Sequence, residues 1–445
     1  MKLKAQPIKF KSMYDFWTQK PVMAAEAWVK GPSKPREVLR DEEAPPEDMS
    51  LETLQEKGIV EIAEPLRVQA PKDLENVPED VDFFIVGETE NLFVQDAILE
   101  KLISLDRPIL AEWDKWGYSW FGRLSKLRFG KFSEARYFNT AGSDDLKALL
   151  NAIRAWKRIR TLRVIYIGEV PSHSVVSSDK GSDFGHLMEL FGTDFVNLDY
   201  ADYTKAVDGV SDSDVEGLVK EWKEKYAVTD GRGEKLKFYA KIYLGLKGLL
   251  GRYNANAVTA DCAWLPDVDY VPCFAFSLLA DEGVVVACEG DIPALYIAAA
   301  LMGASGKPVM MGNLNANATH EDIENNIITV NHDVVPPSMG CSTCRLKLRD
   351  FHATGKGLTP YVDLENMPVT IAGMHWDMDK ICAAKGTIRW TKDTTHCRIT
   401  VGIEVERAKE VHKSSFGHHQ VLAYGDHTKT LKGVARLFGV EYVEL

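Results

Sequence analysis

The sequence contains no apolar run as long as the about 18 residues that a membrane-spanning helix needs. The lysines near its start are not followed by the apolar stretch of a signal peptide. It also contains no cluster of basic residues, and its formal net charge is -12. Nucleic acids and anionic membranes both favour clustered positive charge, so neither is expected as a partner. We therefore expect a cytoplasmic protein.

Cysteine is scarce as well, since seven cysteines, an odd number, are scattered over 445 residues. This usage favours reduced thiols over a disulfide framework. Cys341 and Cys344 form one CxxC pair without a second matching pair. A structural zinc would also require Cys382, His396 or Cys397, and we favour free thiols instead.

Loops that bind nucleotides are missing too. No G-x-G-x-x-G sequence follows a strand-like segment, so a nicotinamide cofactor is not expected. The Gly-Ala-Ser-Gly-Lys segment at 303–307 is too short for a phosphate-binding loop, and Pro308 stands where such loops have Ser or Thr. These features argue against nucleotide-dependent chemistry.

What is present is an alternation of strand-like and helical segments in a chain long enough for about three domains. We expect an α/β protein with two Rossmann-like parallel-sheet domains followed by a β-rich, barrel-like C-terminal domain. The expected parts are an N-terminal arm and first Rossmann-like domain (1–160), a second Rossmann-like domain (161–318) and the barrel-like domain (319–445).

The individual elements follow from hydrophobic periodicity and turn residues. Residues 1–80 are polar and rich in proline, which predicts an irregular arm with short helices such as 50–57. The predicted strands of the two Rossmann-like domains are 81–86, 108–112, 163–167, 194–198, 257–260 and 284–287. The predicted helices there are 91–105, 144–159, 184–191, 211–227 and 234–253. The barrel-like domain should contain strands 326–331, 369–372, 386–390, 397–404 and 420–424 and a helix at 430–438.

The stretch 284–332 organises the rest of the chain. A buried strand at 284–287 leads to Glu289 and Asp291, and Asp291 is a good N-cap for an apolar helix with Pro293 in its first turn. Ligands of open α/β sheets bind at the carboxyl ends of strands, where these two acids lie. Carboxylates suit Mg²⁺ or Mn²⁺. The simpler alternative is an N-cap aspartate beside a solvated glutamate.

Three histidines are candidate ligands. His332 follows a strand-like run, although a lone histidine is more often structural than a ligand. His418 and His419 are adjacent, and neighbouring side chains of a strand point to opposite faces. One metal ion would therefore normally use only one of that pair, with the other free to contact a substrate.

An aromatic run at 111–120 contains Trp113, Trp116, Tyr118 and Trp120. We favour an aromatic core patch, and the functional alternative is a flat platform for the C–H edges of a sugar.

Together, several segments resemble the L-fucose/L-arabinose isomerase superfamily. They are Cys-Glu-Gly-Asp at 288–291 before an alanine-rich helix, Gly-Asn-Leu at 312–314, His332 after a β-run, and the histidine pair 418–419 before Gly425 and Asp426. The similarity covers about residues 160–445, and the first 160 residues agree only in architecture. The resemblance implies a metal-dependent aldose–ketose isomerase that acts on an open-chain sugar through a cis-enediolate.

The resemblance also implies roles for individual residues. Glu289 would bind Mn²⁺, or another divalent ion such as Mg²⁺ or Co²⁺, and move a proton. The family's second acid would fall at Asn313, which can offer a metal its carbonyl oxygen but cannot take a proton. Asp291 is then a candidate for the second acid/base role, and Asn315 or Asn317 could equally occupy the position of Asn313.

Further implied roles concern ligands, substrate and assembly. His332 and His419 would be metal ligands, and His418 and Asn315 would contact the substrate. The resemblance implies a homo-hexamer or homo-trimer in which the first domain of one chain forms one side of the active site of its neighbour. Trp113 and Trp116 would then contact a sugar held mainly by another subunit.

Two alternatives stay open at this point. A non-catalytic sugar-binding or sensing protein would explain the missing second acid. An isomerase for a sulfonated or phosphorylated sugar would need a cation in the pocket, and the candidates are Lys307, Arg345, Lys347 and Lys413.

Overall fold

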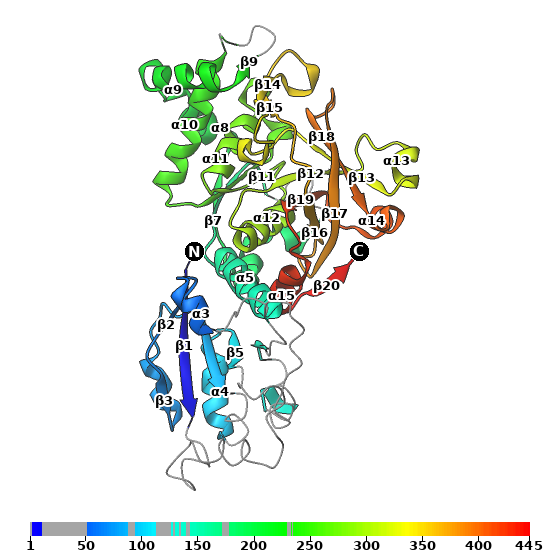
Figure 1. Ribbon diagram of the computed structural model, residues 1–445. Coiled ribbons are helices and arrows are strands. Elements are labelled where there is room, and N and C mark those ends of the chain that lie inside the picture. The colour runs from blue at the N-terminus through cyan, green and yellow to red at the C-terminus, as the bar shows by residue number, and fades with distance from the viewer. Residues whose placement is uncertain are drawn as a thin grey trace. The chain divides into compact units, whose positions relative to one another are not determined.

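The computed structural model describes residues 2–10, 51–87, 94–112, 126–127, 130–132, 135–138, 143–170, 178–228, 233 and 235–445. The chain divides into two compact units, Met1–Ile153 and Arg154–Leu445 (Figure 1). The aromatic residues Trp113 and Trp116 lie outside the described residues. Within the described part, no helix has both the length and the apolar character needed to cross a membrane.

The first unit is built on a parallel sheet of six strands, as expected for a Rossmann-like domain. The strands are β2 (Val60–Ile62), β1 (Leu3–Phe10), β4 (Phe83–Gly87), β5 (Ile109–Glu112) and β6 (Tyr137–Phe138) in spatial order, with β3 (Leu66–Val68) also paired to β1. Helices α3 (Leu51–Glu56) and α4 (Asp96–Ser104) belong to the same unit. The predicted helix at 50–57 is confirmed by α3.

One prediction for this unit is wrong. The irregular arm expected at residues 1–80 instead contributes the interior strand β1, which pairs with β2, β3 and β4. Leu3, Ala5 and Ile8 are fully buried in it. The lysines and Pro7 of this segment weaken its strand pattern, but the neighbouring strands on both sides supply its backbone hydrogen bonds. Its side chains Ile8 and Phe10 pack into the hydrophobic core.

The second unit begins with a parallel sheet that matches the predicted strands. Its order is β11 (Val285–Cys288), β10 (Ala257–Ala260), β7 (Arg163–Ile167) and β8 (Asp194–Leu198). Helices α8 (Tyr200–Asp208), α9 (Asp212–Lys225) and α11 (Cys273–Asp281) pack against α10 (Leu236–Arg252), as the green part of Figure 1 shows. Helices α6 (Asp179–Ser182), α7 (Phe184–Phe191) and α12 (Ile292–Ser305) also belong to this unit, and α5 (Ser143–Arg160) spans the boundary between the two units.

Helix α12 starts just after the carboxyl end of β11, and residues next to its two ends determine where it begins and ends. The Asp291 side chain accepts a hydrogen bond from the Ala294 amide, Pro293 lies in the first turn, and Gly306 ends the helix in the left-handed region with φ 68°. Almost every residue of α12 is buried. A helix that is apolar on all sides must be covered on all sides, and α12 packs against β16 and β19 of the next layer.

The C-terminal part forms a six-stranded antiparallel barrel, which confirms the predicted barrel-like domain. Its strands, in spatial order, are β16 (Pro368–Met374), β19 (His419–Tyr424), β12 (Met310–Leu314), β13 (Ile327–His332), β18 (Ile399–Val405) and β17 (Lys380–Asp393). β17 also pairs with β16, which closes the barrel, and β20 (Glu441–Glu444) pairs with β17 in parallel. Because β12 precedes residue 319, the barrel takes its first strand from the segment expected in the preceding domain.

Smaller elements complete the barrel region. They are α13 (His320–Glu324), α14 (Ala408–Ser414), α15 (Thr428–Phe438) and a three-stranded sheet of β15 (Thr359–Tyr361), β14 (Lys347–Arg349) and β9 (Ala227–Val228).

The free thiols expected at Cys341 and Cys344 are a wrong prediction, because the two residues form a disulfide. A turn in which the Cys344 amide donates to the Cys341 carbonyl brings their Cα atoms to 5.1 Å. The remaining cysteines of the described chain are free, as expected.

Candidate metal centre

Glu289 lies at the turn that joins β11 to α12. It has φ 58°, an uncommon conformation for a residue other than glycine, and Gly290 follows with φ 67°. The Gly290 amide donates to the Ala260 carbonyl and the Asp291 amide to the Cys288 carbonyl, so hydrogen bonds on both sides hold the turn. Strained conformations held in this way concentrate at functional sites.

The barrel brings two distant histidines to the same rim. His332 is the last residue of β13, and His419 is the first residue of β19. Both strands run antiparallel to β12, where Asn313 is opposite Asn331 on one side and His419 on the other. The end of β13 and the start of β19 therefore flank the same point of β12.

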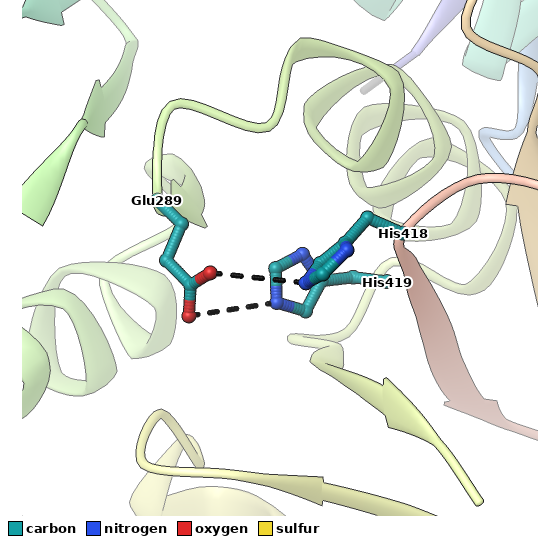
Figure 2. Close-up of side chains that lie close together, drawn as sticks. All are labelled: Glu289, His418 and His419. Carbon is teal, nitrogen blue, oxygen red and sulfur yellow. Dashed lines mark ion pairs between the residues drawn. The ribbon is translucent and has the colours of Figure 1, made fainter. Parts of the chain in front are cut away.

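These residues surround the Glu289 carboxylate, and we call Glu289, His332, His418 and His419 the Glu289 cluster. The Oε1 atom of Glu289 lies 3.5 Å from Nε2 of His332 and 3.7 Å from Nε2 of His419. Its Oε2 atom lies 3.9 Å from Nε2 of His418. Figure 2 shows the carboxylate facing both imidazoles of the 418–419 pair.

Asp291 faces the far side of His419. Its Oδ2 atom lies 2.8 Å from Nδ1 of His419, and its Oδ1 atom accepts from the Ala294 amide at 2.8 Å. Asp291 is 1% exposed, so both carboxylate oxygens have a buried partner. A carboxylate behind a histidine is the usual way in which proteins orient an imidazole that binds a metal.

The charges of the cluster are mutually stabilised in the metal-free protein. Burial by itself would raise the pKa of Glu289, but His332 and His419 outweigh it and hold that pKa well below its ordinary value. Burial would lower the pKa of His419, whereas Asp291 and Glu289 raise it to about 9. Burial and the neighbouring His419 lower the pKa of His418.

The donors of the Glu289 cluster fit a divalent cation. His332 and His419 are 3% and 1% exposed, yet both ring nitrogens of His332 and Nε2 of His419 have no hydrogen-bond partner among the described residues. A buried polar atom without a partner is costly, and a metal ion would satisfy these nitrogens together with the carboxylate. The donor atoms of Glu289, His418 and His419 lie within 4.8 Å of one another.

His418 differs from His419 in its surroundings. Its side chain is 42% exposed, whereas the His419 side chain is fully buried. The two neighbouring rings have centroids 4.5 Å apart at an angle of 76°. His418 therefore combines proximity to Glu289 with access from solvent, as a substrate contact requires.

The two asparagines behave differently. Asn313 is half-buried between the histidine strands, and its Nδ2 atom donates to the Asn331 carbonyl at 3.4 Å. Asn315 has contacts at both ends of its side-chain amide: its Oδ1 atom accepts from the Thr329 amide at 3.0 Å, and its Nδ2 atom lies 2.9 Å from Nδ1 of His412. The amide of Asn315 thus holds the turn after β12.

Three of the four cations expected for an anionic substrate, Lys307, Arg345 and Lys347, lie away from the Glu289 cluster. Lys307 follows the end of α12 opposite to Glu289, about 20 Å away for a helix of this length. The Arg345 guanidinium donates to the carbonyls of Glu224, Lys225 and Tyr226. Lys347 lies over the Tyr361 ring. A pocket of about 430 Å³ is lined by Ser178, Asp179, Lys180, His375, Trp376 and Asp377.

Part of the chain is similar to known proteins. Residues 185–305 match the family described as the L-arabinose isomerase central domain, a span that includes Glu289 and Asp291. The L-arabinose isomerase of Arthrobacter sp. (strain FB24) is 30% identical over 166 residues, which are 35% of this chain and 32% of that protein. The L-arabinose isomerase of Pediococcus pentosaceus is 25% identical over 285 residues, which are 59% of this chain and 57% of that protein.

A relative with a different name matches over a longer span. The sulfoquinovose isomerase of Alkalicoccus urumqiensis is 23% identical over 332 residues, which are 71% of each chain. The matches to the first two relatives span only about a third and somewhat more than half of those proteins. By residues 185–305 and by these relatives, the chain is similar to L-arabinose isomerases.

Proposed function

We propose that this chain is a metal-dependent aldose–ketose isomerase that acts on an open-chain sugar through a cis-enediolate. The observation that carries the proposal is the approach of two buried imidazoles, whose Nε2 atoms have no hydrogen-bond partner among the described residues, to the Glu289 carboxylate at a strand end. The ketol-isomerases among its relatives support the same reaction class.

In this proposal Glu289, His332 and His419 hold a divalent ion, Mn²⁺ or another such as Mg²⁺ or Co²⁺. Asn313 is the fourth protein ligand, through its carbonyl oxygen, because it is opposite His419 on the neighbouring strand. When bound, the ion supplies positive charge to the C1 and C2 oxygens of the sugar and so stabilises the enediolate. Asp291 orients His419 rather than moving a proton, because both of its oxygens are already engaged.

Two protons must move in an aldose-to-ketose conversion. We assign the carbon-bound proton to Glu289, whose Oε2 atom faces the open side of the site: it removes the proton from C2 and returns it to C1. We assign the hydroxyl proton, which moves from O2 to O1, to His418, because its exposed imidazole adjoins the same carboxylate oxygen. This division explains how the site can work without a carboxylate at position 313.

The relatives' names make L-arabinose and sulfoquinovose the first sugars to test. The longer match to the sulfoquinovose isomerase favours an anionic sugar as the second candidate, although Lys307, Arg345 and Lys347 lie outside the Glu289 cluster. We also propose a homo-hexamer or homo-trimer, which sedimentation equilibrium would test directly.

The deciding experiment combines elemental analysis with turnover. Purified protein would be assayed with Mn²⁺ on a panel of pentoses, hexoses and sulfoquinovose, and Glu289→Gln would be compared with Glu321→Gln, an exposed glutamate of α13. Bound divalent metal and turnover lost only in Glu289→Gln support the isomerase. A protein without metal or turnover whose melting temperature rises with a sugar would be a binding protein instead.

A further inference from the structure

A second group of ligating side chains lies beside the Glu289 cluster and has no part in the proposed reaction. Asp333 directly follows His332, His352 lies in the loop after β14, and Cys397 precedes β18. We call these three residues the Cys397 cluster. Asp333 and Cys397 are 1% and 4% exposed, and the His352 side chain is 28% exposed, so the group is buried with one open side.

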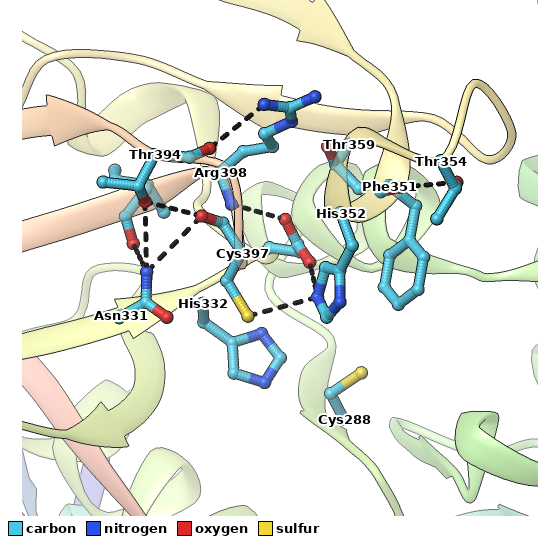
Figure 3. A network of polar contacts seen from close by, with 12 residues as sticks. Cys288, Asn331, His332, Phe351, His352, Thr354, Thr359, Thr394, Cys397 and Arg398 are labelled. Carbon is cyan, nitrogen blue, oxygen red and sulfur yellow. Dashed lines mark hydrogen bonds and ion pairs between the residues drawn. The ribbon is translucent and has the colours of Figure 1, made fainter. Parts of the chain in front are cut away.

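The three donor atoms converge on one point. Nε2 of His352 lies 2.8 Å from Oδ2 of Asp333 and 3.3 Å from Sγ of Cys397, and all three atoms lie within 4.8 Å of one another. Figure 3 shows the Cys397 thiol directed at the His352 ring. A neutral imidazole nitrogen carries at most one proton and cannot donate fully to both partners. A cation at the same point would satisfy all three atoms.

The backbone around the cluster holds these side chains in position. His352 and Cys397 have φ values of 48° and 53°, so two of the three residues are in the left-handed region that glycine favours. Oδ1 of Asp333 accepts from the Arg398 amide at 2.7 Å, which turns Oδ2 towards His352. Proteins orient metal-binding carboxylates by such hydrogen bonds.

A buried ion pair ties the His352 loop to the Cys397 strand. Arg398 and Asp350 are 4% and 5% exposed and form an ion pair, and the Arg398 Nε atom also donates to the Asp350 carbonyl at 2.8 Å. Asp350 begins the loop that contains His352, and Arg398 directly follows Cys397. The ligand positions are thus preorganised in the absence of an ion, which lowers the cost of binding one.

We propose that Asp333, His352 and Cys397 form a second metal site, separate from the Glu289 cluster, for a borderline divalent ion of the Zn²⁺ type. A thiolate, an imidazole and a carboxylate select such an ion over Mg²⁺ or Mn²⁺, which prefer oxygen ligands. Binding exchanges the thiol proton of Cys397 for the cation and releases that proton to solvent. The ion joins three segments of the barrel region and fixes Asp333, the residue next to His332.

The two sites can be told apart by their ligands, because the Glu289 cluster contains no sulfur. The metal-depleted full-length protein would be titrated with Co²⁺ and its absorption spectrum recorded. A thiolate ligand produces a sulfur-to-cobalt charge-transfer band in the near ultraviolet, and nitrogen and oxygen ligands do not. We expect this band in the wild type and in Glu289→Gln, and its loss in Cys397→Ser. The matched control is Cys382→Ser, a buried free thiol outside both clusters, which should keep the band.

A second variant keeps the test decisive if Cys397→Ser does not fold. His352→Ala removes a partly exposed ligand, and we expect it to lose the band and to reduce bound Co²⁺ from about two equivalents per chain to about one. Absence of the band in wild-type protein, or its persistence in His352→Ala or Cys397→Ser, would overturn the second site. Because Glu289→Gln leaves this readout intact, failure of the isomerase proposal would be seen separately.

Discussion

Asp291 Oδ2 lies 2.8 Å from Nδ1 of His419, and the two side chains are almost completely buried. The same aspartate caps α12 through its other oxygen. One residue thus fixes both the start of the helix behind the site and the orientation of a candidate ligand. With Nδ1 engaged, Nε2 is the nitrogen of His419 that faces Glu289.

Asp291→Asn separates these two roles. Asparagine caps a helix about as well as aspartate, so stability should change little, but it carries no charge to support His419. We expect the affinity for Mn²⁺ to fall about 10–100-fold, measured by titration calorimetry. Asp183→Asn, at the exposed cap of α7, is the control that should leave affinity unchanged. Equal affinities in Asp291→Asn and wild type would remove Asp291 from the site.

His332→Ala and His418→Ala test which histidines hold the ion. His332 is buried without a hydrogen-bond partner in the described structure, so its loss should abolish Mn²⁺ binding at the Glu289 cluster. His418→Ala should keep the metal and lower kcat by about 10²–10⁴-fold, as expected for a proton carrier. His320→Ala, whose side chain is 91% exposed, serves as the control. The reverse result, with metal lost only in His418→Ala, would assign the ion to Glu289, His418 and His419 instead.

Removal of metal should destabilise the second unit. The Glu289 cluster places two buried imidazoles around a carboxylate, and an ion that binds only the folded state adds about 2.7 kcal/mol at 100 times its Kd. We expect a chelator to lower the melting temperature measured by calorimetry and Mn²⁺ to restore it in wild type but not in Glu289→Gln. If Mn²⁺ does not change the melting temperature of the wild type, the Glu289 cluster does not bind this ion in the folded protein.

Gly303→Ala tests the packing of α12. A Cβ atom at this position would lie 2.6 Å from the Ala155 Cα atom of α5, and the helix backbones cannot separate without loss of other contacts. We expect the free energy of unfolding to fall by about 1–3 kcal/mol in urea titrations. Gly248→Ala, in α10 with nothing within 4 Å, should be neutral or stabilising by up to about 1 kcal/mol. Equal effects of the two substitutions would show that α12 can move away from α5.

Much of the second unit could be predicted because its signals are local. Helix α7 and strands β8 and β10 have the expected bounds, since each apolar run ends at a turn or capping residue. The N-cap at Asp291 followed from residue type and position alone. Glu289 could be found for the same reason, because the end of a buried strand before a helix is visible in the chain.

Other features depend on partners that are distant in sequence. Strand β1 contains lysines and a proline, and only β2, β3 and β4 around it make it an interior strand. Asn315 had a plausible place in the site by sequence, yet its amide is bound to Thr329 and His412. The disulfide of Cys341 and Cys344 depends on a turn that the CxxC spacing permits but does not require.

The sequence by itself therefore determined the α/β order of elements, the barrel-like C-terminal domain and the position of Glu289 and Asp291 between a buried strand and a helix. Only the tertiary structure decided that Asp291 faces His419, that His332 and His419 share one carboxylate oxygen, and that Asp333, His352 and Cys397 converge. The physical reason is that capping and periodicity act over a few residues. Ligand convergence instead depends on antiparallel pairing that brings β13, β12 and β19 side by side.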